Sequence, residues 1–373
     1  MNSTLKTTFN SVKKLADAFV KIMAKAMPAL EADNSFVESG KSYVYEYILP
    51  SNFHDLPTEF AEQYVTKVRI NPNKIYYLND VYTNWQGVTF KNIKIFLPSL
   101  FTPESITYFQ ESLLLKQWFG DIIELNDVTG VAIANNQYAP NNYFHWIIDT
   151  LPRLLILSRQ HPGIRLIIPE SPAKFITETI SAFGFHNPIQ ISSQQVVKAK
   201  LLILPDEHAT PLGHSSPAVI REVRTRILHH LGSSFSGSRK RIFISREKQK
   251  FRNIVNQDEI DILLNTYNFE KVYFEELTMH KQVSIMQQAS IVLSVHGANM
   301  VNCIFCDEGT PIIELDSRMH RNPAYWRLCS VFSLPYYILP CQTIPDEPVN
   351  FSTNADLHVD ISDLTAILRK LID

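Results

Sequence analysis

The chain has 373 residues, of which 45% are hydrophobic and 19% are charged, a composition that excludes an intrinsically disordered protein. The chain is long for a single hydrophobic core, so we expect two domains. The formal net charge of -2 excludes a general nucleic-acid binder, which normally carries a basic excess.

The first 30 residues predict a basic amphipathic helix. Apolar residues between Leu5 and Met27 share one arc of a helical wheel, and lysines occupy the opposite side. Such a helix suits peripheral contact with an anionic membrane through residues 1–30, although packing on the protein itself explains the apolar face equally well. No apolar run reaches the length of about 20 residues that spans a membrane.

The cysteines and the N-terminus favour a cytoplasmic protein, located at the inner face of the membrane if the helix binds lipid. No cleavable signal is visible, and all four cysteines lie in the last quarter of the chain. Cys303 and Cys306 match C-x-x-C, but a zinc site needs two further ligands, and Cys329 and Cys341 lack paired spacing. We therefore expect buried apolar cysteines and no metal.

Residues 40–232 predict the first domain. The runs "SYVYEYIL", "KIYYLNDVY" and "GVTFKNIKIFLP" alternate as strands do, and "ESITYFQESLLLKQWF" has helical periodicity. The buried runs "GVAIAN", "IRLIIP" and "KLLILP" come next, with the helix "AKFITETISAFGF" between the last two. Strands that alternate with helices of this length indicate parallel α/β units. Residues 205–217 are predicted as a loop, before a helix that stops at Gly232.

A second α/β domain is expected over residues 239–345. The Ser/Gly-rich segment "SSFSGSRK" precedes it as a linker. Strands "RIFISRE", "EKVYFEE", "SIVLSV" and "TPIIELD" then alternate with helices that begin at the predicted caps Asn256 and Thr278. A separate helix is predicted over 355–373, with Ser362 near its cap.

The segment "SIVLSVHGANM" predicts an anion site at a strand end. The apolar strand stops at Val295, the chain turns at Gly297, and a helix should begin near Asn299. Open α/β folds bind ligands at this edge of the sheet, where free N–H groups at a helix start favour phosphate. His296 and Asn299 add side-chain donors. By itself, an ordinary turn with a hydrogen-bonded histidine explains the motif at least as well.

The segment "ISREKQKFRNIVN" lies at the equivalent end of the first strand of the same domain. Arginine binds phosphate oxygens in a bidentate manner, so two arginines on one strand-end loop suit a diphosphate. Solvated surface charge is the alternative, but a second strand end with donors makes an anion site the better interpretation. The candidate residues in this loop are Ser245, Arg246, Arg252 and Asn253.

The end of "TPIIELD" offers carboxylates beside the predicted anion site. Glu314 is well placed there to bind ribose hydroxyls, as in nucleotide-binding folds generally. Glu314 and Asp316 form an E-x-D pair, which we expect to lie on opposite faces of the strand. The D-x-D of metal-dependent sugar transferases, the dinucleotide and P-loop glycine motifs and the hydrolase G-x-S-x-G are all absent from the sequence.

The segment "NNYFHWIIDTLPRL", residues 141–154, predicts a helix that carries a site. His145 and Asp149 are four apart and share a helical face. A carboxylate bonded to one imidazole nitrogen fixes the tautomer and makes the other nitrogen a better proton acceptor. Asn142, one turn earlier, could hold a substrate hydroxyl. A helix cap at Asn141 or Asn142 with a buried His–Asp hydrogen bond explains the same residues structurally.

Arg153 would continue the face of His145 and Asp149. Pro152 disfavours helical geometry at Leu151, so the 145–149 pairing is the firmer of the two.

Together these stretches resemble glycosyltransferase family 61. The matching segments are "NYFHWIIDTLPRL", "ISRE…FRNIVN", the "L-T…QV…A-S-I-V…HGAN" run and "IFCDEGTPIIEL", and they span roughly residues 130–320. The family includes bacterial capsular-polysaccharide enzymes, plant xylosyltransferases and animal enzymes that add N-acetylglucosamine to glycoproteins. One difference is that the family more often has glycine where Asn299 stands, and asparagine tolerates a left-handed turn better than most residues.

The resemblance implies a GT-B-like fold, with two facing Rossmann-like α/β domains and the active site in the cleft. It also implies inverting transfer from a nucleotide sugar, usually a UDP-sugar, to a glycan or other hydroxyl acceptor, without a metal or other cofactor, as in polysaccharide biosynthesis. Applied to this chain, the resemblance implies that the diphosphate is bound by Arg246, Arg252, His296, Gly297 and Asn299. It also implies that the ribose is bound by Glu314 and that the acceptor faces Asn142, His145 and Asp149.

The mechanism expected from these parts has His145, oriented by Asp149, deprotonate the acceptor hydroxyl. The arginines and the helix start then stabilise the departing diphosphate in place of a metal. Asp149 itself is the second choice for the base. Two other readings stay open: a non-catalytic nucleotide- or glycan-binding module, and a structural partner recruited to membrane by residues 1–30.

Overall fold

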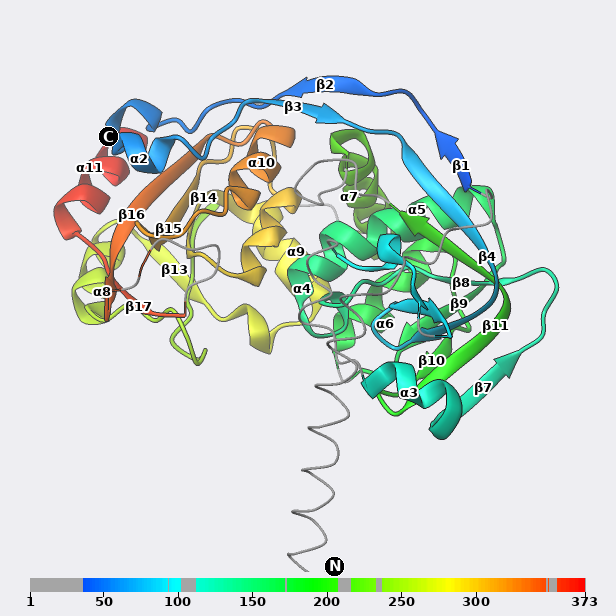
Figure 1. The fold of residues 1–373 in the computed structure, drawn as a ribbon. Helices are drawn as coiled ribbons and strands as arrows, with labels where there is room; N and C mark the ends of the chain where they lie inside the picture. Colours follow the sequence, from blue (N-terminus) through cyan, green and yellow to red (C-terminus); the bar gives the residue numbers. More distant parts are fainter. Residues whose placement is uncertain are drawn as a thin grey trace, which may run out of the picture. The chain divides into compact units, whose positions relative to one another are not determined.

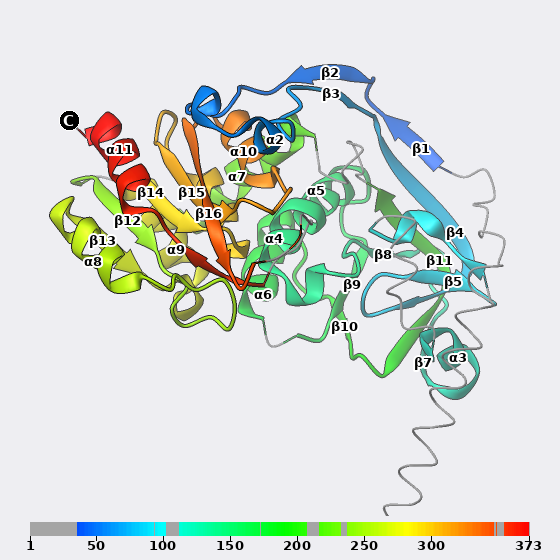
Figure 2. The same ribbon diagram turned by 60° about the vertical axis from the view of Figure 1, so that its left-hand side comes forward.

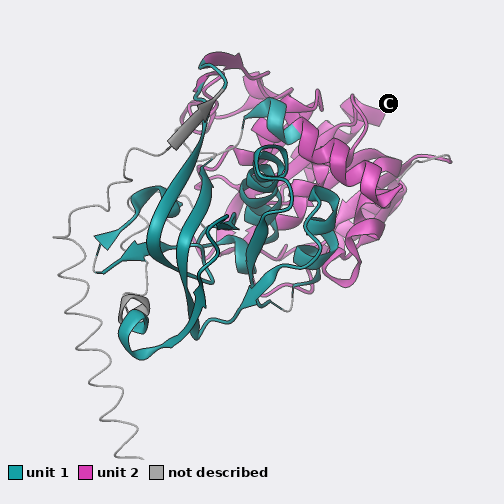
Figure 3. Ribbon diagram, turned by 90° about the vertical axis from the view of Figure 1, so that its right-hand side faces the viewer, with its two compact units in different colours: residues 1–42, 70–220 teal, residues 43–69, 221–373 magenta. Residues whose placement is uncertain are grey.

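The computed structural model describes residues 36–92, 94–101, 112–171, 173–206, 216–232, 237–346, 348 and 354–372. The chain forms two compact units, each built from two stretches of sequence: Met1–Ser42 with Ile70–Ile220, and Tyr43–Arg69 with Arg221–Asp373 (Figure 3). The amphipathic helix predicted over residues 1–30 lies outside the described residues. Membrane contact and a cytoplasmic location therefore stay predictions.

The first unit is built on a mixed nine-stranded sheet, in the order β10-β9-β8-β11-β4-β5-β6, with β1 paired to β4 and β7 to β11. Its two longest strands, β4 and β11, run antiparallel from Val196 opposite Asn84 to Asp206 opposite Lys74. Only β7 to β11 form the parallel part that the sequence predicts. The strands are β1 (Phe36–Ser39), β4 (Asn73–Asn84), β5 (Thr89–Lys91), β6 (Lys94–Ile95), β7 (Asp121–Leu125), β8 (Val131–Ile133), β9 (Arg165–Pro169), β10 (Ile189–Ile191) and β11 (Gln195–Asp206).

Short connections account for the antiparallel pairs β4–β5 and β5–β6, whereas β4 and β11 pair antiparallel over a long separation in sequence. A turn at Gly87, whose φ is +82°, joins β4 to β5, and β5 pairs antiparallel with β6. Such tight turns permit only antiparallel neighbours, because a parallel pair needs a long crossover. The α/β class is therefore found, but the first unit is a mixed sheet and not a purely parallel one.

The helices of the first unit include the segment that carries His145. One continuous helical stretch changes type twice there, from α4 to the π-helix η5 and then to α5, and Trp146, Leu151 and Leu154 are fully buried within it. The helical elements are η2 (Leu97–Ser99), α3 (Ser112–Phe119), η4 (Ala139–Asn141), α4 (Tyr143–His145), η5 (Trp146–Thr150), α5 (Leu151–Gln160), α6 (Lys174–Ile180) and η6 (Ser181–Phe183). Helix α7 (Pro217–Leu231) begins in the first unit and continues into the second.

The second unit has a six-stranded sheet in the order β13-β12-β14-β15-β16-β17. The first five strands are parallel, and β17 is antiparallel to β16 (Figures 1 and 2). The strands are β12 (Lys240–Ile244), β13 (Phe269–Val272), β14 (Ala289–Val295), β15 (Ile312–Ser317), β16 (Tyr336–Ile344) and β17 (Asp356–His358). The predicted alternation of strands and helices is present in this unit.

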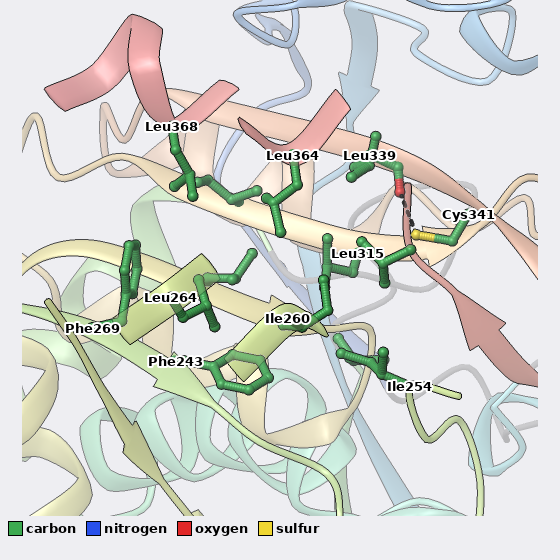
Figure 4. Close-up of a cluster of buried hydrophobic side chains, with 14 of the residues drawn as sticks. Phe243, Ile254, Ile260, Leu264, Phe269, Leu315, Leu339, Cys341, Leu364 and Leu368 are labelled. Carbon is green, nitrogen blue, oxygen red and sulfur yellow. Dashed lines mark hydrogen bonds between the residues drawn. The ribbon is translucent and has the colours of Figure 1, made fainter. Parts of the chain in front are cut away.

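The helices of the second unit lie on both faces of its sheet. Leu264 of α8 and Leu364 and Leu368 of α11 pack with Phe243 and Leu315 of the strands into one hydrophobic cluster (Figure 4). The helical elements are α8 (Gln257–Thr266), η7 (Phe274–Glu276), α9 (Met279–Gln288), the 3-10 helix η8 (Ala298–Phe305), α10 (Ala324–Val331) and α11 (Ile361–Ile372). The C-terminal helix that the sequence sets apart at 355–373 is thus part of this core.

Residues 43–69 belong to the second unit, although the sequence suggests placing them in a domain over 40–232. Asn52 pairs with both backbone groups of Ile338: its Nδ2 donates to Ile338 O at 2.8 Å and its Oδ1 accepts from Ile338 N at 3.1 Å. Trp326 Nε1 donates to Ile48 O at 2.6 Å. The elements of this segment are β2 (Tyr43–Glu46), η1 (Phe53–Asp55), α2 (Thr58–Ala61) and β3 (Lys67–Ile70), with β2 paired to β3.

Within the described part of the chain, no helix combines the length and apolar character needed to cross a membrane. Most of the predicted loop 205–217 lies outside the described residues. The facing two-domain arrangement of a GT-B fold stays a prediction.

Candidate active-site residues in each unit

The helical segment of the first unit is shaped by Asn142 and Pro152. Asn142 is the N-cap of α4, and its side chain accepts from Phe144 N at 3.0 Å and from His145 N at 3.4 Å. Pro152 has no N–H to donate into the preceding turn, and that turn is the π-helix η5. Contrary to the expectation from Pro152, Leu151 keeps right-handed helical backbone angles.

His145 and Asp149 form the predicted pair. His145 Nδ1 lies 2.7 Å from Asp149 Oδ2, and the same oxygen accepts from Asn136 Nδ2 at 2.9 Å. Asn136 is itself held, because its Oδ1 accepts from Tyr138 N and Ala139 N, each at 3.0 Å. The Asp149 side chain is 4% exposed and that of His145 is 19% exposed. With Nδ1 facing the carboxylate, Nε2 is the nitrogen left for a substrate proton.

Aromatic rings surround the imidazole of His145. Phe101, Tyr138 and Phe144 lie with ring centroids 5.2, 5.2 and 5.4 Å from it. Phe101 and Tyr138 also contact each other, at 5.4 Å. These contacts restrict the rotation of the imidazole and lower the polarity around it.

The structure gives Asn142 and Arg153 structural roles. The Asn142 side chain caps the helix, as the alternative interpretation of the sequence expected. Arg153 is 3% exposed, and its Nη1 donates to Ala134 O at 3.3 Å. Arg153 is buried, whereas Asn142 is half-buried and only its side-chain oxygen is used by the cap. Acceptor binding by these two residues stays a prediction.

Two arginines meet Gly297 in the second unit. Arg252 Nη1 donates to His296 O at 3.1 Å, and Arg246 donates to Phe251 O through Nε and Nη2. A Cβ added to Gly297 would lie 2.1 Å from Arg246 Nη1, so the guanidinium occupies the space that any larger residue needs. Gly297 is required for this close approach and not for its backbone angles, since its φ of 170° is extended.

In the part of the chain that the structure describes, the two guanidinium groups have no carboxylate within ion-pair distance. Among the described residues, neither Arg246 nor Arg252 forms an ion pair, and Arg252 Nε is buried without a hydrogen-bond partner. Burial, together with the positive charge of Arg252, lowers the pKa of Arg246 to about 10. Like charges held together in this way favour an anion as the missing partner.

His296 is held by a buried network. Its Nδ1 lies 2.5 Å from Glu314 Oε1 and 3.5 Å from Asp316 Oδ2, while Tyr336 Oη donates to Glu314 Oε2 at 2.6 Å. His320 Nδ1 lies 2.8 Å from Asp316 Oδ2. Burial works to raise the pKa of Asp316, but the charge of His296 and the hydrogen bond of His320 outweigh it and lower that pKa.

The expectation that Glu314 and Asp316 lie on opposite faces of β15 was wrong. Side chains alternate along a strand, so residues two apart share a face, and His296 meets both carboxylates. Glu314 is 1% exposed and has both oxygens bonded within the protein. This places it as the partner of His296. Ribose binding by Glu314 stays a prediction that these contacts do not support.

His296, Asp316 and His320 are also the residues of the described chain that could hold a metal ion. One ligand atom from each lies within 4.8 Å of the others, and all three residues are buried. Two imidazoles and a carboxylate suit a transition metal. The Nδ1 atoms of both histidines already have carboxylate partners, however, so a hydrogen-bonded network accounts for these groups without an ion.

The remaining predicted donor-site residues shape the strand-end loops. Ser245 Oγ donates to Glu247 Oε2 at 3.0 Å within the turn. Asn253 fixes the loop to β17 through its backbone, with its N–H donating to Asp356 Oδ1 at 2.8 Å. Asn299 lies in the first turn of the 3-10 helix η8 and is not among the residues with positive φ, so the left-handed turn considered for it is not used.

Several residues of these sites were not identified from the sequence. Asn136 lies on a loop 13 positions before its partner and has no periodic relation to it. Asp316 and His320 repeat, in reverse order, the four-residue spacing of His145 and Asp149, a signal that the sequence does contain. The aromatic partners could not be selected from the many aromatic residues of the chain: Phe101, Tyr138, Tyr325, whose hydroxyl donates to Gly297 O at 2.6 Å, and Tyr336.

Comparison with known proteins bears directly on these residues. Residues 143–313 match the family described as Glycosyltransferase 61, a range that runs from α4 into β15. A segment of 114 residues is 28% identical to the EGF domain-specific O-linked N-acetylglucosamine transferase of Drosophila melanogaster. That similarity covers 28% of this chain and only 22% of the length of the fly protein.

The matched range includes the His145–Asp149 pair, the loop with Arg246 and Arg252, and the turn at Gly297, and it stops one residue before Glu314. It agrees with the span of roughly 130–320 predicted from the motifs. The resemblance of this chain to glycosyltransferase family 61 is therefore confirmed, over residues 143–313.

Proposed function

We propose that the protein is an inverting glycosyltransferase that moves a sugar from a nucleotide-sugar donor, in the first instance a UDP-sugar, to a hydroxyl group of a glycan. The family similarity supports glycosyl transfer in general. The donor nucleotide, the stereochemistry, the absence of a metal and a role in polysaccharide biosynthesis are our proposals. The arginine pair is the observation that carries the donor assignment.

The donor side of the proposal follows from the charges around Gly297. Arg246 and Arg252 present two positive charges at the C-terminal edge of a parallel sheet, with no ion pair to a described carboxylate. A nucleoside diphosphate supplies the missing negative charge, and its charge increases as the bond to the sugar breaks. Donors fixed in advance at that position stabilise the transition state more than the ground state.

The acceptor side follows from the His145–Asp149 pair. Nε2 of His145 takes the proton of the acceptor hydroxyl as its oxygen attacks the anomeric carbon. The bond from that carbon to the diphosphate oxygen breaks with its electron pair, so the nucleoside diphosphate leaves and the configuration inverts. Asp149, held by Asn136, keeps the imidazole in the required tautomer and stabilises the imidazolium that forms.

Thermal unfolding in the presence of UDP, GDP, CMP and dTDP tests the donor assignment. A nucleotide at about 100 times its dissociation constant should add roughly 2.7 kcal/mol of stability. We expect this shift with UDP, and we expect Arg246→Ala and His296→Ala to remove it. Lys240→Ala is the control, since it removes an exposed positive charge from the opposite end of β12. Absence of a shift with all four nucleotides would sink the donor assignment.

Transfer and binding have to be separated, because a non-catalytic nucleotide-binding module would also pass the first test. Because the similar fly protein is an N-acetylglucosamine transferase, UDP-N-acetylglucosamine is the first donor to screen. We expect the wild type to release UDP slowly from one UDP-sugar even without acceptor, and His145→Ala with Asp149→Asn to abolish the release. Nucleotide binding without any sugar release would favour the non-catalytic module.

Metal independence is tested by chelation. The arginine pair and the hydrogen-bonded His296 network lead us to expect that dialysis against EDTA leaves the UDP-induced shift unchanged. Loss of the shift on dialysis, with recovery on adding Mn²⁺ or Zn²⁺ and not in an Asp316→Asn variant, would instead make His296, Asp316 and His320 a metal site.

A further inference from the structure

The surroundings of His145 define what an acceptor can touch. A general base must lie within hydrogen-bond reach, about 2.6–3.2 Å, of the proton it removes. The acceptor therefore has to contact the groups that border the imidazole. Of the other side chains predicted for that contact, Arg153 is buried against Ala134, and Asn142 uses its side-chain oxygen to cap the helix.

The side chains that do border the imidazole are aromatic. Tyr138 is 37% exposed, its ring centroid is 5.2 Å from that of His145, and the two planes are inclined by only 32°. Phe101 is half-buried and meets both rings nearly edge-on, at 79°. The broad faces of Tyr138 and His145 therefore point in similar directions, with Phe101 set against them.

Both aromatic residues are held by the backbone. Tyr138 N donates to Asn136 Oδ1 at 3.0 Å, and Phe101 N donates to Gln137 Oε1 at 3.1 Å. The residue that orients Asp149 thus also fixes Tyr138. A rigid platform of this kind loses little conformational entropy when a ligand binds to it.

We propose, on the basis of the transferase function above, that Tyr138 and Phe101 form an acceptor subsite that packs against the apolar face of a pyranose ring. A pyranose presents C–H groups on its ring faces and hydroxyl groups around its edge. One face can cover the exposed ring of Tyr138, which removes apolar surface from water. An edge hydroxyl is then directed at His145 Nε2. The acceptor of this subsite is a sugar ring, and not the isolated hydroxyl of a serine side chain.

The test is ligand-observed NMR with saturation transfer, on the full chain and with UDP present. The probes are methyl glycosides of glucose, galactose, xylose and N-acetylglucosamine, together with N-acetylserine amide. We expect at least one pyranoside to bind, with the strongest saturation on its ring C–H protons, and Tyr138→Ala to abolish that signal. Tyr138→Phe should retain it, because the ring is kept. Phe119→Ala removes an aromatic side chain that is 86% exposed in the same unit and serves as the control.

Kinetics with the best-bound pyranoside give a second readout. Tyr138→Ala should raise the acceptor KM by roughly tenfold and leave kcat within a few-fold, because the packing acts equally on ground and transition states. The donor KM should not change. If no pyranoside binds, if binding is the same in Tyr138→Ala, or if the serine amide binds in preference, the subsite is overturned.

These outcomes are distinct from failure of the transferase function. Pyranoside binding that depends on Tyr138, without sugar transfer from any donor, would keep the subsite and remove the catalysis. UDP binding and sugar transfer that are indifferent to Tyr138 would keep the catalysis and remove the subsite.

Discussion

The side-chain amide of Asn136 contacts both Asp149 and the loop that carries Tyr138. Its Nδ2 donates to Asp149, and its Oδ1 accepts two backbone N–H groups of the loop that carries Tyr138. Because Asp149 is nearly buried, a lost donor leaves that carboxylate less firmly oriented toward His145. The position is therefore sensitive to a change that removes very little volume.

Replacing Asn136 by alanine should lower both kcat and the melting temperature, because the Asp149 carboxylate and two backbone N–H groups lose a hydrogen-bond partner. A hydrogen bond to a charged group is worth about 1.5–3 kcal/mol, which corresponds to roughly a 10- to 100-fold loss of kcat if it acts through Asp149. Asn135→Ala is the matched control, because Asn135 Nδ2 donates to Trp85 O and not to the pair. Steady-state kinetics and melting temperatures of both variants decide the matter, and equal losses of kcat in the two would contradict it.

Gly297→Ala tests the close approach of Arg246. The new methyl group would lie 2.1 Å from Arg246 Nη1 and must displace the guanidinium. We expect the UDP-induced shift in melting temperature to shrink, with little change in the melting temperature of the free protein. The double variant with Arg246→Ala supplies the check: if the methyl acts through Arg246, it has no further effect once the arginine is gone.

At the scale of elements, the chemistry lies where regular structure is interrupted. The π-helix η5 carries Asp149, and the pair bridges the junction between α4 and η5. Pro152 accounts for the widened turn, since it offers no N–H and its ring would clash with the carbonyl of Ile148 in an α-helix. The same proline is the reason why a uniform helix over 141–154 is an incomplete prediction.

Pro152→Ala should convert η5 toward an α-helix. The restored N–H removes the cause of the widened turn, and His145 and Asp149, four residues apart, share a face of an α-helix as well. We expect the melting temperature to stay constant or rise, because an interior proline costs a helix about 3 kcal/mol. We expect kcat to stay within a few-fold of the wild type. A fall in kcat of more than about tenfold, on the order of one lost charged hydrogen bond, would show that the pair depends on the π-turn.

Strand β15 makes the stability of the second unit sensitive to acid. The pKa of Asp316 is lowered in the folded protein, so its carboxylate contributes stability above the unfolded pKa of about 3.9, and that stability is lost as the pH falls through the folded value. Melting temperatures between pH 6 and pH 3 should therefore drop less steeply in Asp316→Asn than in the wild type. The same slope in both proteins would contradict a role for Asp316.

The sequence predicts where helices and strands lie better than it predicts which of them are adjacent in the fold. Periodicity and caps predict the helices after Asn256 and Thr278, and the strands that end at Ile244 and Val295. The side chain of Thr278 does cap its helix, whereas that of Asn256 forms no cap hydrogen bond. The His145–Asp149 pair follows from helical spacing alone. The network of Asp316, His320 and Tyr336 depends on which strands are adjacent, and strand order is not visible in local pattern.

The mixed sheet of the first unit was missed for a similar reason. The run "KIYYLNDVY" predicts a strand but does not indicate that its neighbour in the sheet, β11, runs antiparallel to it. The assignment of Asn142 and Arg153 to an acceptor stays a prediction, and both side chains bond backbone groups, as polar side chains on a buried helix commonly do. Which group a polar side chain bonds depends on whether that side chain is buried, and the local sequence predicts burial only in part.

At the scale of the whole molecule, the two units do not follow one another along the chain. Residues 43–69 belong to the second unit, and the first unit continues from Ile70 to Ile220 before the second resumes. Asn52, Ser51 and Trp326 join the early segment to α10 and β16 by hydrogen bonds. The backbone of Ile338 thus forms hydrogen bonds with Asn52, a residue that precedes the stretch Ile70–Ile220 of the first unit in the sequence.

Asn52→Ala should destabilise the protein by about 1–3 kcal/mol, because it leaves the N–H and C=O of Ile338 without their partner in a buried place. Urea denaturation followed by tryptophan fluorescence measures the loss, and exposed Asn126→Ala is the control. The UDP-induced shift should persist in the folded variant. A change within about 0.5 kcal/mol would show that water replaces Asn52 there.

Residues 43–69 are synthesised early but belong to the unit that is completed last, and this affects folding during synthesis. Asn52 and Ile338 are 286 positions apart, so a nascent chain exposes this segment long before its docking surface has been synthesised. The first unit can close on its own sheet in the meantime, whereas the second must wait for nearly the whole chain, and such long loop closures are slow. Tyr43, Val44 and Ile48 remain exposed even in the folded state. The segment is therefore the stretch that a chaperone would have the longest time to bind.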